Sequence, residues 1–190
     1  MLLSLCTEFP ISFFFLLPPA LMDIIIWNSR GALKPNFQSY VGDLVHDHNP
    51  AIMVVMETKI GGARAKEITD RLPFDGAIHS NTIGYAGGLW LLWNSDGVIM
   101  GLLATTEQEI HVSVKVRPFD FECILSVVYA SPRFNERSVL WNNLVNVASL
   151  HSSLWIIAGD LNEVLADDEK YGGRVVNANR SLLFKDCLDA

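Results

Sequence analysis

The sequence LWIIAGDLNE, residues 154–163, joins an apolar run to a pair of polar side chains. Five apolar residues followed by glycine predict a buried strand, with Asp160 and Asn162 at its end. Residues two positions apart in an extended chain point to the same side, so we expect this carboxylate and this amide to converge. Such an oxygen-rich pair suits Mg²⁺ and a phosphate group; the alternative for both residues is a helix N-cap.

Three other polar side chains stand at the ends of predicted strands. Asn28 follows the apolar residues 24–27, Glu57 follows residues 52–56, and Tyr129 lies within the run VVYASP, residues 127–132. Alone, each has a structural explanation as a turn residue, a solvated acid or a core aromatic. Together they indicate a site, because ligands of layered α/β proteins bind at strand ends.

The apolar pattern alternates between the period of strands and the period of helices. We expect helices at 36–48, 63–72, 136–150 and 179–188, and strands at 23–28, 51–56, 87–93, 98–104, 110–116, 121–130 and 154–158. In the strand 110–116, one face carries His111, Ser113 and Lys115 and is expected to be solvated. The pattern predicts an α/β fold, a layered sandwich of two mixed β-sheets flanked by helices.

Composition limits the function classes. The chain has 190 residues, of which 50% are hydrophobic and 18% charged, which is typical of one globular domain. Its net charge of −7 opposes tight non-specific binding to nucleic acid, although acidic metal ligands of a nuclease would add to that charge. Three widely spaced cysteines predict neither a disulfide framework nor a zinc site, and favour an intracellular compartment, nucleus or cytoplasm.

Residues 1–21 form an apolar leader of different character. No Lys or Arg precedes Arg30, so a secretory signal is not favoured. Pro10, Pro18 and Pro19 interrupt the apolar run, which is too short to cross a membrane. We therefore expect the leader to lie outside the fold, and one domain to span residues 22–190.

The order of the strand-end motifs resembles the endonuclease/exonuclease/phosphatase superfamily, whose fold is that of pancreatic deoxyribonuclease. The motifs are WNSRG at 27–31, METK at 56–59, GGL at 87–89, VYASP at 128–132 and GDLNE at 159–163. In detail the chain looks most like the endonuclease domain of plant LINE-type (non-LTR) retrotransposons. Arg30 stands where abasic-site repair enzymes usually carry an acid, and EKYGGR at 169–174 is similar to the retroelement version.

The resemblance implies Mg²⁺-dependent phosphodiester hydrolysis and a role for each residue. Glu57 would be the principal Mg²⁺ ligand with Asn28 beside it, and Mn²⁺ is an alternative ion. Asp160 would orient or deprotonate the attacking water, while Asn162 and Tyr129 would hydrogen-bond the scissile phosphate. These roles agree with the chemistry, since a phosphodiester needs charge neutralisation and a positioned water.

The resemblance also implies DNA as the ancestral substrate, with Arg30, Lys59 and Arg174 contacting its phosphates; no stable protein partner is inferred. Complete members of the superfamily continue with further strands that carry an Asp and an Asp-His pair. Here the last histidine is His151 and the chain ends at Ala190. We therefore expect a domain that lacks its C-terminal strands, with weak or lost activity. An inert retroelement remnant and a phosphatase of the same superfamily are the alternatives.

Overall fold

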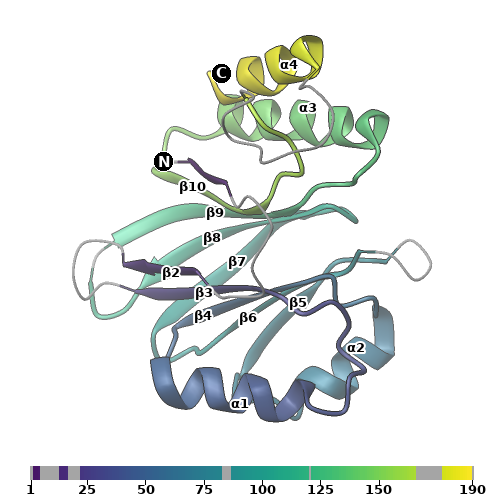
Figure 1. Cartoon of the computed structure of the whole chain (residues 1–190). Helices are drawn as coiled ribbons and strands as arrows, with labels where there is room; N and C mark the ends of the chain where they lie inside the picture. The colour runs from purple at the N-terminus through teal and green to yellow at the C-terminus, as the bar shows by residue number, and fades with distance from the viewer. Residues whose placement is uncertain are drawn as a thin grey trace.

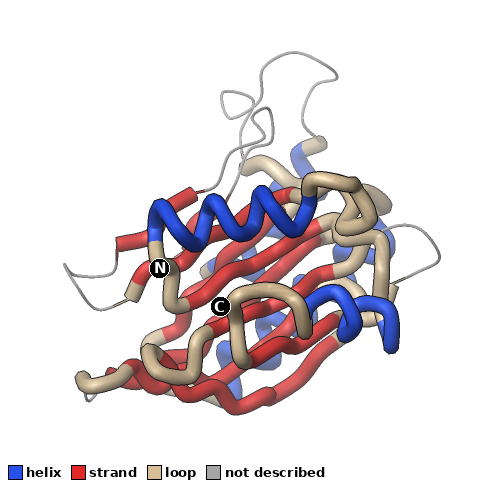
Figure 2. The backbone as a smooth tube through the Cα atoms, turned by 90° about the horizontal axis from the view of Figure 1, so that it is seen from below, coloured by secondary structure: helices blue, strands red, loops and turns tan. Residues whose placement is uncertain are grey.

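Four layers make up the molecule, with two β-sheets face to face and a pair of helices outside each sheet (Figure 1). The computed structural model describes residues 22–82, 87–119, 121–165 and 177–189, together with the backbone of two short strands within residues 1–21. Figure 2, turned by 90°, shows helices in front of and behind the strands. The predicted layered α/β sandwich of two mixed sheets is confirmed.

The first sheet has the strand order β2-β3-β4-β6-β5. The strands are β2 (Phe13–Leu16), β3 (Asp23–Asn28), β4 (Ile52–Met56), β6 (Leu89–Trp93) and β5 (Gly76–His79). Only β3 and β4 run parallel among these neighbours, and their register pairs Asn28 with Met56. The loops that follow these two strands therefore leave the sheet at the same edge.

The second sheet has the strand order β1-β10-β9-β8-β7. The strands are β1 (Leu2–Ser4), β10 (Trp155–Asp160), β9 (Phe121–Tyr129), β8 (Glu109–Val116) and β7 (Val98–Thr105). β9 and β10 are parallel, and Asp160 pairs with Tyr129. Two of the predicted site residues are thus neighbours in the sheet.

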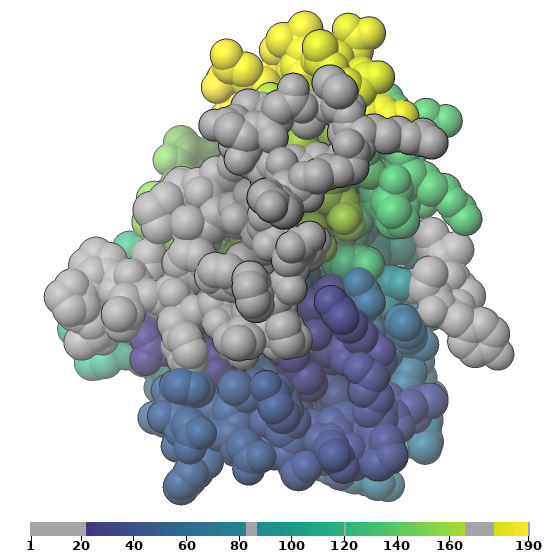
Figure 3. Space-filling view, viewed as in Figure 1, coloured from purple at the N-terminus to yellow at the C-terminus, as the bar shows by residue number. Residues whose placement is uncertain are grey.

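The helices cover the outer faces of the sheets: α1 (Phe37–His48) and α2 (Gly62–Thr69) lie on the first, and α3 (Phe134–Leu150) and α4 (Ala178–Leu188) on the second. The space-filling view places the purple-blue segment and the yellow α4 at opposite ends of the molecule (Figure 3). No helix in the described part of the chain is long and apolar enough to cross a membrane.

Three apolar clusters hold these layers together. One fills the space between the sheets, where Val54 of β4 and Val127 of β9 are fully buried. A second lies beneath α1 and α2 around Trp90, and a third beneath α3 and α4 around Phe184. β4 is buried along its whole length because it faces the first two clusters, which explains why its sequence is an unbroken apolar run.

All predicted helices and strands are present, with bounds shifted by at most three residues. β5 is a strand that was not predicted, because it has four residues and no apolar run that would have indicated it. Its position depends on tertiary contact with β6, where the backbone of Gly76 packs closely against the Trp93 ring. A Cβ at Gly76 would lie 2.0 Å from that ring.

We expected residues 1–21 to lie outside the fold. The structure pairs the backbone of β1 with β10 and that of β2 with β3, at the edges of the two sheets.

The expectation of a solvated face on β8 is wrong at His111. His111 is 2% exposed, and its Nδ1 lies 2.6 Å from the hydroxyl of Ser126 on the neighbouring strand. Its Nε2 lies 3.0 Å from Glu109 Oε2, without the alignment of a hydrogen bond. Asn143 of α3 donates to the other Glu109 oxygen, so a helix covers this end of the strand while Ser113 and Lys115 stay exposed.

Candidate functional site

The carboxylate of Glu57 joins residues from both sheets. Glu57 follows β4, and its Oε1 accepts a hydrogen bond from Asn28 Nδ2 at 2.9 Å. The same oxygen accepts a second hydrogen bond from the hydroxyl of Tyr129, the last residue of β9, also at 2.9 Å. Three of the predicted site residues therefore meet at one point, where the ends of β3, β4 and β9 come together.

Small polar neighbours hold the two loops of the first sheet in register. Ser29 is buried, and both its backbone N–H and its hydroxyl donate to the carbonyl of Met56 at 3.0 Å. The N–H of Thr58 donates to Gly88 O at 3.1 Å. Asn28 and Glu57 are thus fixed by the residues that follow them in the WNS and ET motifs.

Asp160 and Asn162 form a tight turn at the end of β10. Asp160 is 4% exposed, and its Oδ1 accepts the backbone N–H of Asn162 at 2.9 Å. Asn162 Nδ2 donates to Ala130 O at 2.6 Å, so its side chain is tied to the residue after Tyr129. The chain does not stay extended here, as the two-residue spacing suggested, because Asn162 adopts a φ of +49°. No helix begins at Asp160 or Asn162 within the described residues up to 165, so the N-cap explanation does not hold there.

Left-handed backbone is concentrated at this site. Five non-glycine residues have positive φ in the described part of the chain, and four of them are Arg30, Glu57, Lys59 and Asn162. The fifth, Asn49, ends α1. Such conformations cost roughly 1–3 kcal/mol each and tend to gather where function requires a fixed geometry. All four were predicted as site residues for other reasons.

Burial and neighbouring charge shift two pKa values in the site. Burial raises the pKa of Asp160, the nearby Glu57 charge raises it further, and the Asn162 N–H acts in the opposite direction. Burial also raises the pKa of Tyr129 well above its usual range, with further contributions from its hydrogen bond to Glu57 and the charges of Glu57 and Asp160. Tyr129 is therefore a protonated donor at neutral pH.

The oxygen atoms at this point fit a hard divalent cation. Glu57 Oε1 accepts both hydrogen bonds, while no hydrogen bond from the described residues reaches Oε2. Asn28 Oδ1 accepts the N–H of Arg30 at 3.1 Å, which occupies one of its two lone pairs. The described residues contain no group of three or more His, Cys, Asp or Glu that could hold a metal. One carboxylate and one amide suit Mg²⁺, which binds few protein ligands and keeps several waters.

The predicted cations divide into two groups. Arg30 and Lys59 are exposed on the loops after β3 and β4, beside Asn28 and Glu57. Arg174 lies outside the described residues.

Sequence reasoning missed one ion pair close to the site. Arg137 of α3 is 4% exposed, and its Nη2 donates to Glu163 Oε2 at 2.8 Å. Glu163 directly follows Asn162. No pattern in the sequence separates Arg137 from the exposed arginines, because its burial depends on the packing of α3 against the second sheet.

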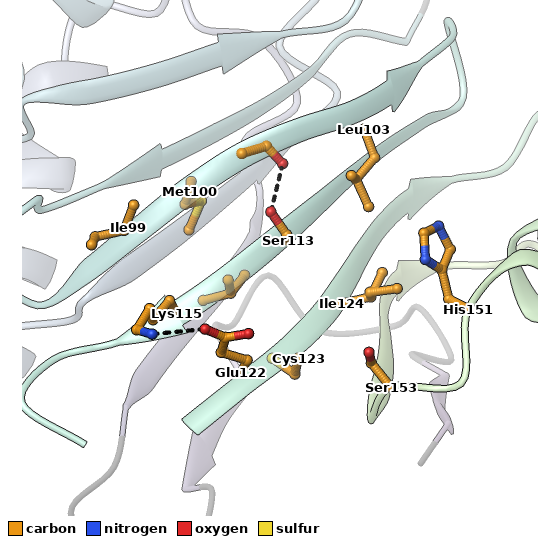
Figure 4. A pocket seen from close by; sticks show the side chains of 12 residues that line it. Ile99, Met100, Leu103, Ser113, Lys115, Glu122, Cys123, Ile124, His151 and Ser153 are labelled. Atoms are coloured by element: carbon orange, nitrogen blue, oxygen red, sulfur yellow. Dashed lines mark hydrogen bonds and ion pairs between the residues drawn. The ribbon is translucent and has the colours of Figure 1, made fainter. Parts of the chain in front are cut away.

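A groove of about 320 Å³ lies away from these residues, on the outer face of the second sheet (Figure 4). It is lined by β7, β8 and β9 and by the loop before β10, with His151 and Ser153 at its side. An ion pair 2.8 Å long, between Lys115 of β8 and Glu122 of β9, is part of its lining. None of the predicted site residues lines this groove.

Comparisons with known proteins agree with this arrangement. Residues 25–175 match the model of the endonuclease/exonuclease/phosphatase family. No curated protein sequence matches the chain.

Solved structures of several nucleases and phosphatases share the fold. An AP endonuclease from Leishmania major has a TM-score of 0.68 at 13% identity, over 87% of this chain and 65% of that one. The endonuclease domain of TRAS1, a telomere-specific non-LTR retrotransposon, has a TM-score of 0.63 at 14% identity, over 87% of this chain and 69% of that one. A 3′ phosphatase from Neisseria, bound to a product DNA hairpin, has a TM-score of 0.58 at 18% identity, over 88% and 70%.

This chain thus spans 65% of the length of the Leishmania enzyme. At these identities the likeness concerns the fold, which is deoxyribonuclease-I-like. The family match is independent of it, and it covers the strand-end residues of both sheets. The chain belongs to the endonuclease/exonuclease/phosphatase family.

Proposed function

We propose that the site around Glu57 is built for Mg²⁺-dependent phosphodiester hydrolysis of the DNA-endonuclease type. The observation that supports this proposal most directly is the hydrogen bonding of the Glu57 carboxylate. One oxygen is held by Asn28 and Tyr129, and the other receives no hydrogen bond from the described residues. Glu57 and Asn28 would hold the cation, with Mn²⁺ as the alternative ion. Bound there, the cation would neutralise charge on the phosphate.

Asp160 has the properties of a base for the attacking water. The Asn162 N–H fixes one of its carboxylate oxygens, which leaves the second oxygen to orient a water molecule. Burial raises the pKa of Asp160, which makes it a better proton acceptor than an exposed aspartate.

Asn162 and Tyr129 have donors for the phosphate. The amide nitrogen of Asn162 carries two hydrogens, of which Ala130 O takes one and the second is left for a phosphate oxygen. Tyr129 stays protonated at neutral pH because its pKa is raised. Fixed donors of this kind stabilise the charge that develops on a phosphoryl group during hydrolysis. Arg30 and Lys59 are exposed beside the site and would contact neighbouring phosphates of the strand.

We further propose that hydrolysis by this chain is slow or lost. All five histidines lie in described segments, and none makes a described hydrogen bond to Glu57, Tyr129, Asp160 or Asn162. The resemblance assigns a histidine to the scissile phosphate, and removal of such an acid–base group typically costs about 10²–10⁴-fold in rate. The same observation favours the alternative of an inert retroelement remnant.

The retroelement origin is a proposal that rests on the motifs around Arg30 and residues 169–174. The likeness to the TRAS1 endonuclease domain supports it at the level of the fold. DNA is the proposed substrate on the same grounds, and the net charge of −7 predicts weak, salt-sensitive affinity for it.

The decisive experiment measures Mg²⁺ binding by calorimetry and nicking of supercoiled plasmid on the same preparation. We expect Mg²⁺ to bind, nicking to require Mg²⁺ or Mn²⁺, and Glu57→Gln to abolish both. Glu122→Gln is the matched control, because Glu122 is an exposed acid on the far face of the second sheet.

Three other outcomes separate the alternatives. Mg²⁺ binding with neither nicking nor phosphate release would identify an inert remnant. Phosphate release from a 3′-phosphorylated oligonucleotide without nicking would identify a phosphatase. Folded protein that binds no Mg²⁺ would refute the proposed enzyme.

A further inference from the structure

Arg137 connects the two loops that carry the catalytic side chains of the second sheet. From α3, its Nη2 donates to Glu163 Oε2 and its Nη1 to the carbonyl of Ser131, both at 2.8 Å. Ser131 is two residues after Tyr129, and Glu163 is one residue after Asn162. One guanidinium therefore holds both loops, through two nitrogens that lie in a single rigid plane.

Two hydrogen bonds join these loops directly, from Asn162 Nδ2 to Ala130 O at 2.6 Å and from Ala130 N to Asp160 O at 2.8 Å. The buried Leu161 packs in one apolar cluster with Ala130. Asn162 is exposed and has left-handed backbone, so packing alone does not hold it in place. Arg137 and Glu163 are buried on the helix side of this contact, with side chains only 5% and 9% exposed.

We propose that Arg137 and Glu163 are positioning residues for the proposed hydrolysis: together they set where Asn162 and Asp160 stand relative to Tyr129. The pair makes no described hydrogen bond to Glu57, Asn28, Tyr129, Asp160 or Asn162, so its contacts reach the site through the two loops. The charge of Arg137 also acts on Asp160, whose pKa it lowers. This inference rests on the proposed function for its effect on rate, whereas its effect on loop geometry is independent of that function.

A second arginine, at the start of the same helix but outside it, serves as a matched control. Arg133 precedes α3 by one residue and pairs with Glu136 at 2.8 Å, but its side chain is 76% exposed. Arg133→Met removes the same charge within about one turn of Arg137. It leaves the bonds of Arg137 to Ser131 and Glu163 in place.

The test compares Arg137→Lys, Arg137→Met and the double variant Arg137→Met/Glu163→Leu. The double variant replaces both charges by apolar groups, so it leaves no unpaired buried charge and keeps the fold even where Arg137→Met alone does not. We expect the double variant to unfold at a temperature close to that of the wild type. We expect its kcat for plasmid nicking to fall about 10²-fold with KM unchanged, since a displacement of about 1 Å costs that much. Arg137→Lys keeps the charge without the planar pair of donors, and we expect only partial recovery.

Hydrogen exchange at the backbone amides of Asn162 and Ala130 tests the loop geometry without any activity. We expect faster exchange at both amides in the double variant and unchanged exchange in Arg133→Met. A double variant that keeps the wild-type kcat and the wild-type exchange rates would overturn the proposal. Folded wild type that binds no Mg²⁺ would refute the proposed function, whereas wild type that binds Mg²⁺ without nicking has lost the reaction. In both cases the exchange rates alone decide whether the pair positions the loops.

Discussion

Replacing Asn162 by glycine and, separately, by alanine distinguishes two properties of this residue. One is the hydrogen bonding of its side chain, and the other is the left-handed conformation of its backbone. Both variants lose the amide that donates to Ala130 O at 2.6 Å. They differ in the left-handed conformation at a φ of +49°, which glycine adopts freely and alanine does not.

The two changes have different expected costs. Loss of the hydrogen bond costs about 1 kcal/mol in either variant. Alanine adds roughly 1 kcal/mol for the left-handed backbone, which gives about 2 kcal/mol in total. For a domain of this size each kcal/mol lowers the melting temperature by about 2–4 °C. We expect Asn162→Ala to melt about 4–8 °C below the wild type, and Asn162→Gly about 2–4 °C below it.

The rate of plasmid nicking should not follow this order. If the second amide hydrogen of Asn162 binds the phosphate, both variants lose about 10²–10³-fold in kcat, as expected for one lost donor to a charged transition state. Thermal denaturation and nicking kinetics on the same samples measure both effects.

Asn49 provides a control, because it has a φ of +43° at the end of α1 and precedes β4, whereas Glu57 follows the other end of that strand. Asn49→Ala and Asn49→Gly should show the same difference in melting temperature with no change in rate. Wild-type nicking by Asn162→Gly would refute a role for the amide in the reaction. Equal melting temperatures of the two Asn162 variants would refute the argument from backbone conformation.

Three further outcomes follow from the structure. Glu57→Gln should lose the heat of Mg²⁺ binding in calorimetry while it keeps the wild-type fold by circular dichroism; retained binding would mean that another residue holds the ion. The pKa of Asp160 is raised in the folded state, so as pH rises the unfolded chain releases this proton first and the folded state loses stability. Asp160→Asn should therefore melt above the wild type at pH 7.5 and close to it at pH 3, and a lower melting temperature at pH 7.5 would contradict the burial argument. Gly159→Ala should fail to give folded protein, because its φ is +136° and a Cβ would lie 1.9 Å from Val128 O, whereas Gly62→Ala, with φ +60° and open space, should cost only about 1 kcal/mol by thermal denaturation.

The fold could be predicted from the sequence where apolar runs are long and a polar residue follows each run. Residues 52–56 form an unbroken apolar run because β4 is buried on both faces, and Glu57 marks its end. The ends of β3, β9 and β10 are marked in the same way by polar residues, and these residues proved to lie together. This is why the sequence predicted the layers and the grouping of these strand-end residues.

The rest depends on contacts between distant segments. β5 has only four residues, and it is a strand because it pairs with β6. His111 alternates with valines like a solvated residue, yet it lies beneath a helix that begins more than twenty residues later. The left-handed backbone at Glu57 and Lys59 could not be predicted, because neither position is a glycine. Arg137 and Glu163 are 26 residues apart in the sequence, and no local sequence pattern indicates that they pair.

The two hydrogen bonds that Glu57 accepts make the geometry of the site depend on the distance between the two sheets. One donor, Asn28, belongs to the first sheet and the other, Tyr129, to the second, and both reach the same oxygen at 2.9 Å. The distance between these donors is set by the side chains packed between the sheets, among them Val54 and Val127. We expect a methyl group gained or lost in that interior to change the distance from one donor to the oxygen, although the substituted residue lies on neither loop of the site. Core substitutions that barely change the free energy of unfolding should for this reason still change the two hydrogen bonds that Glu57 accepts.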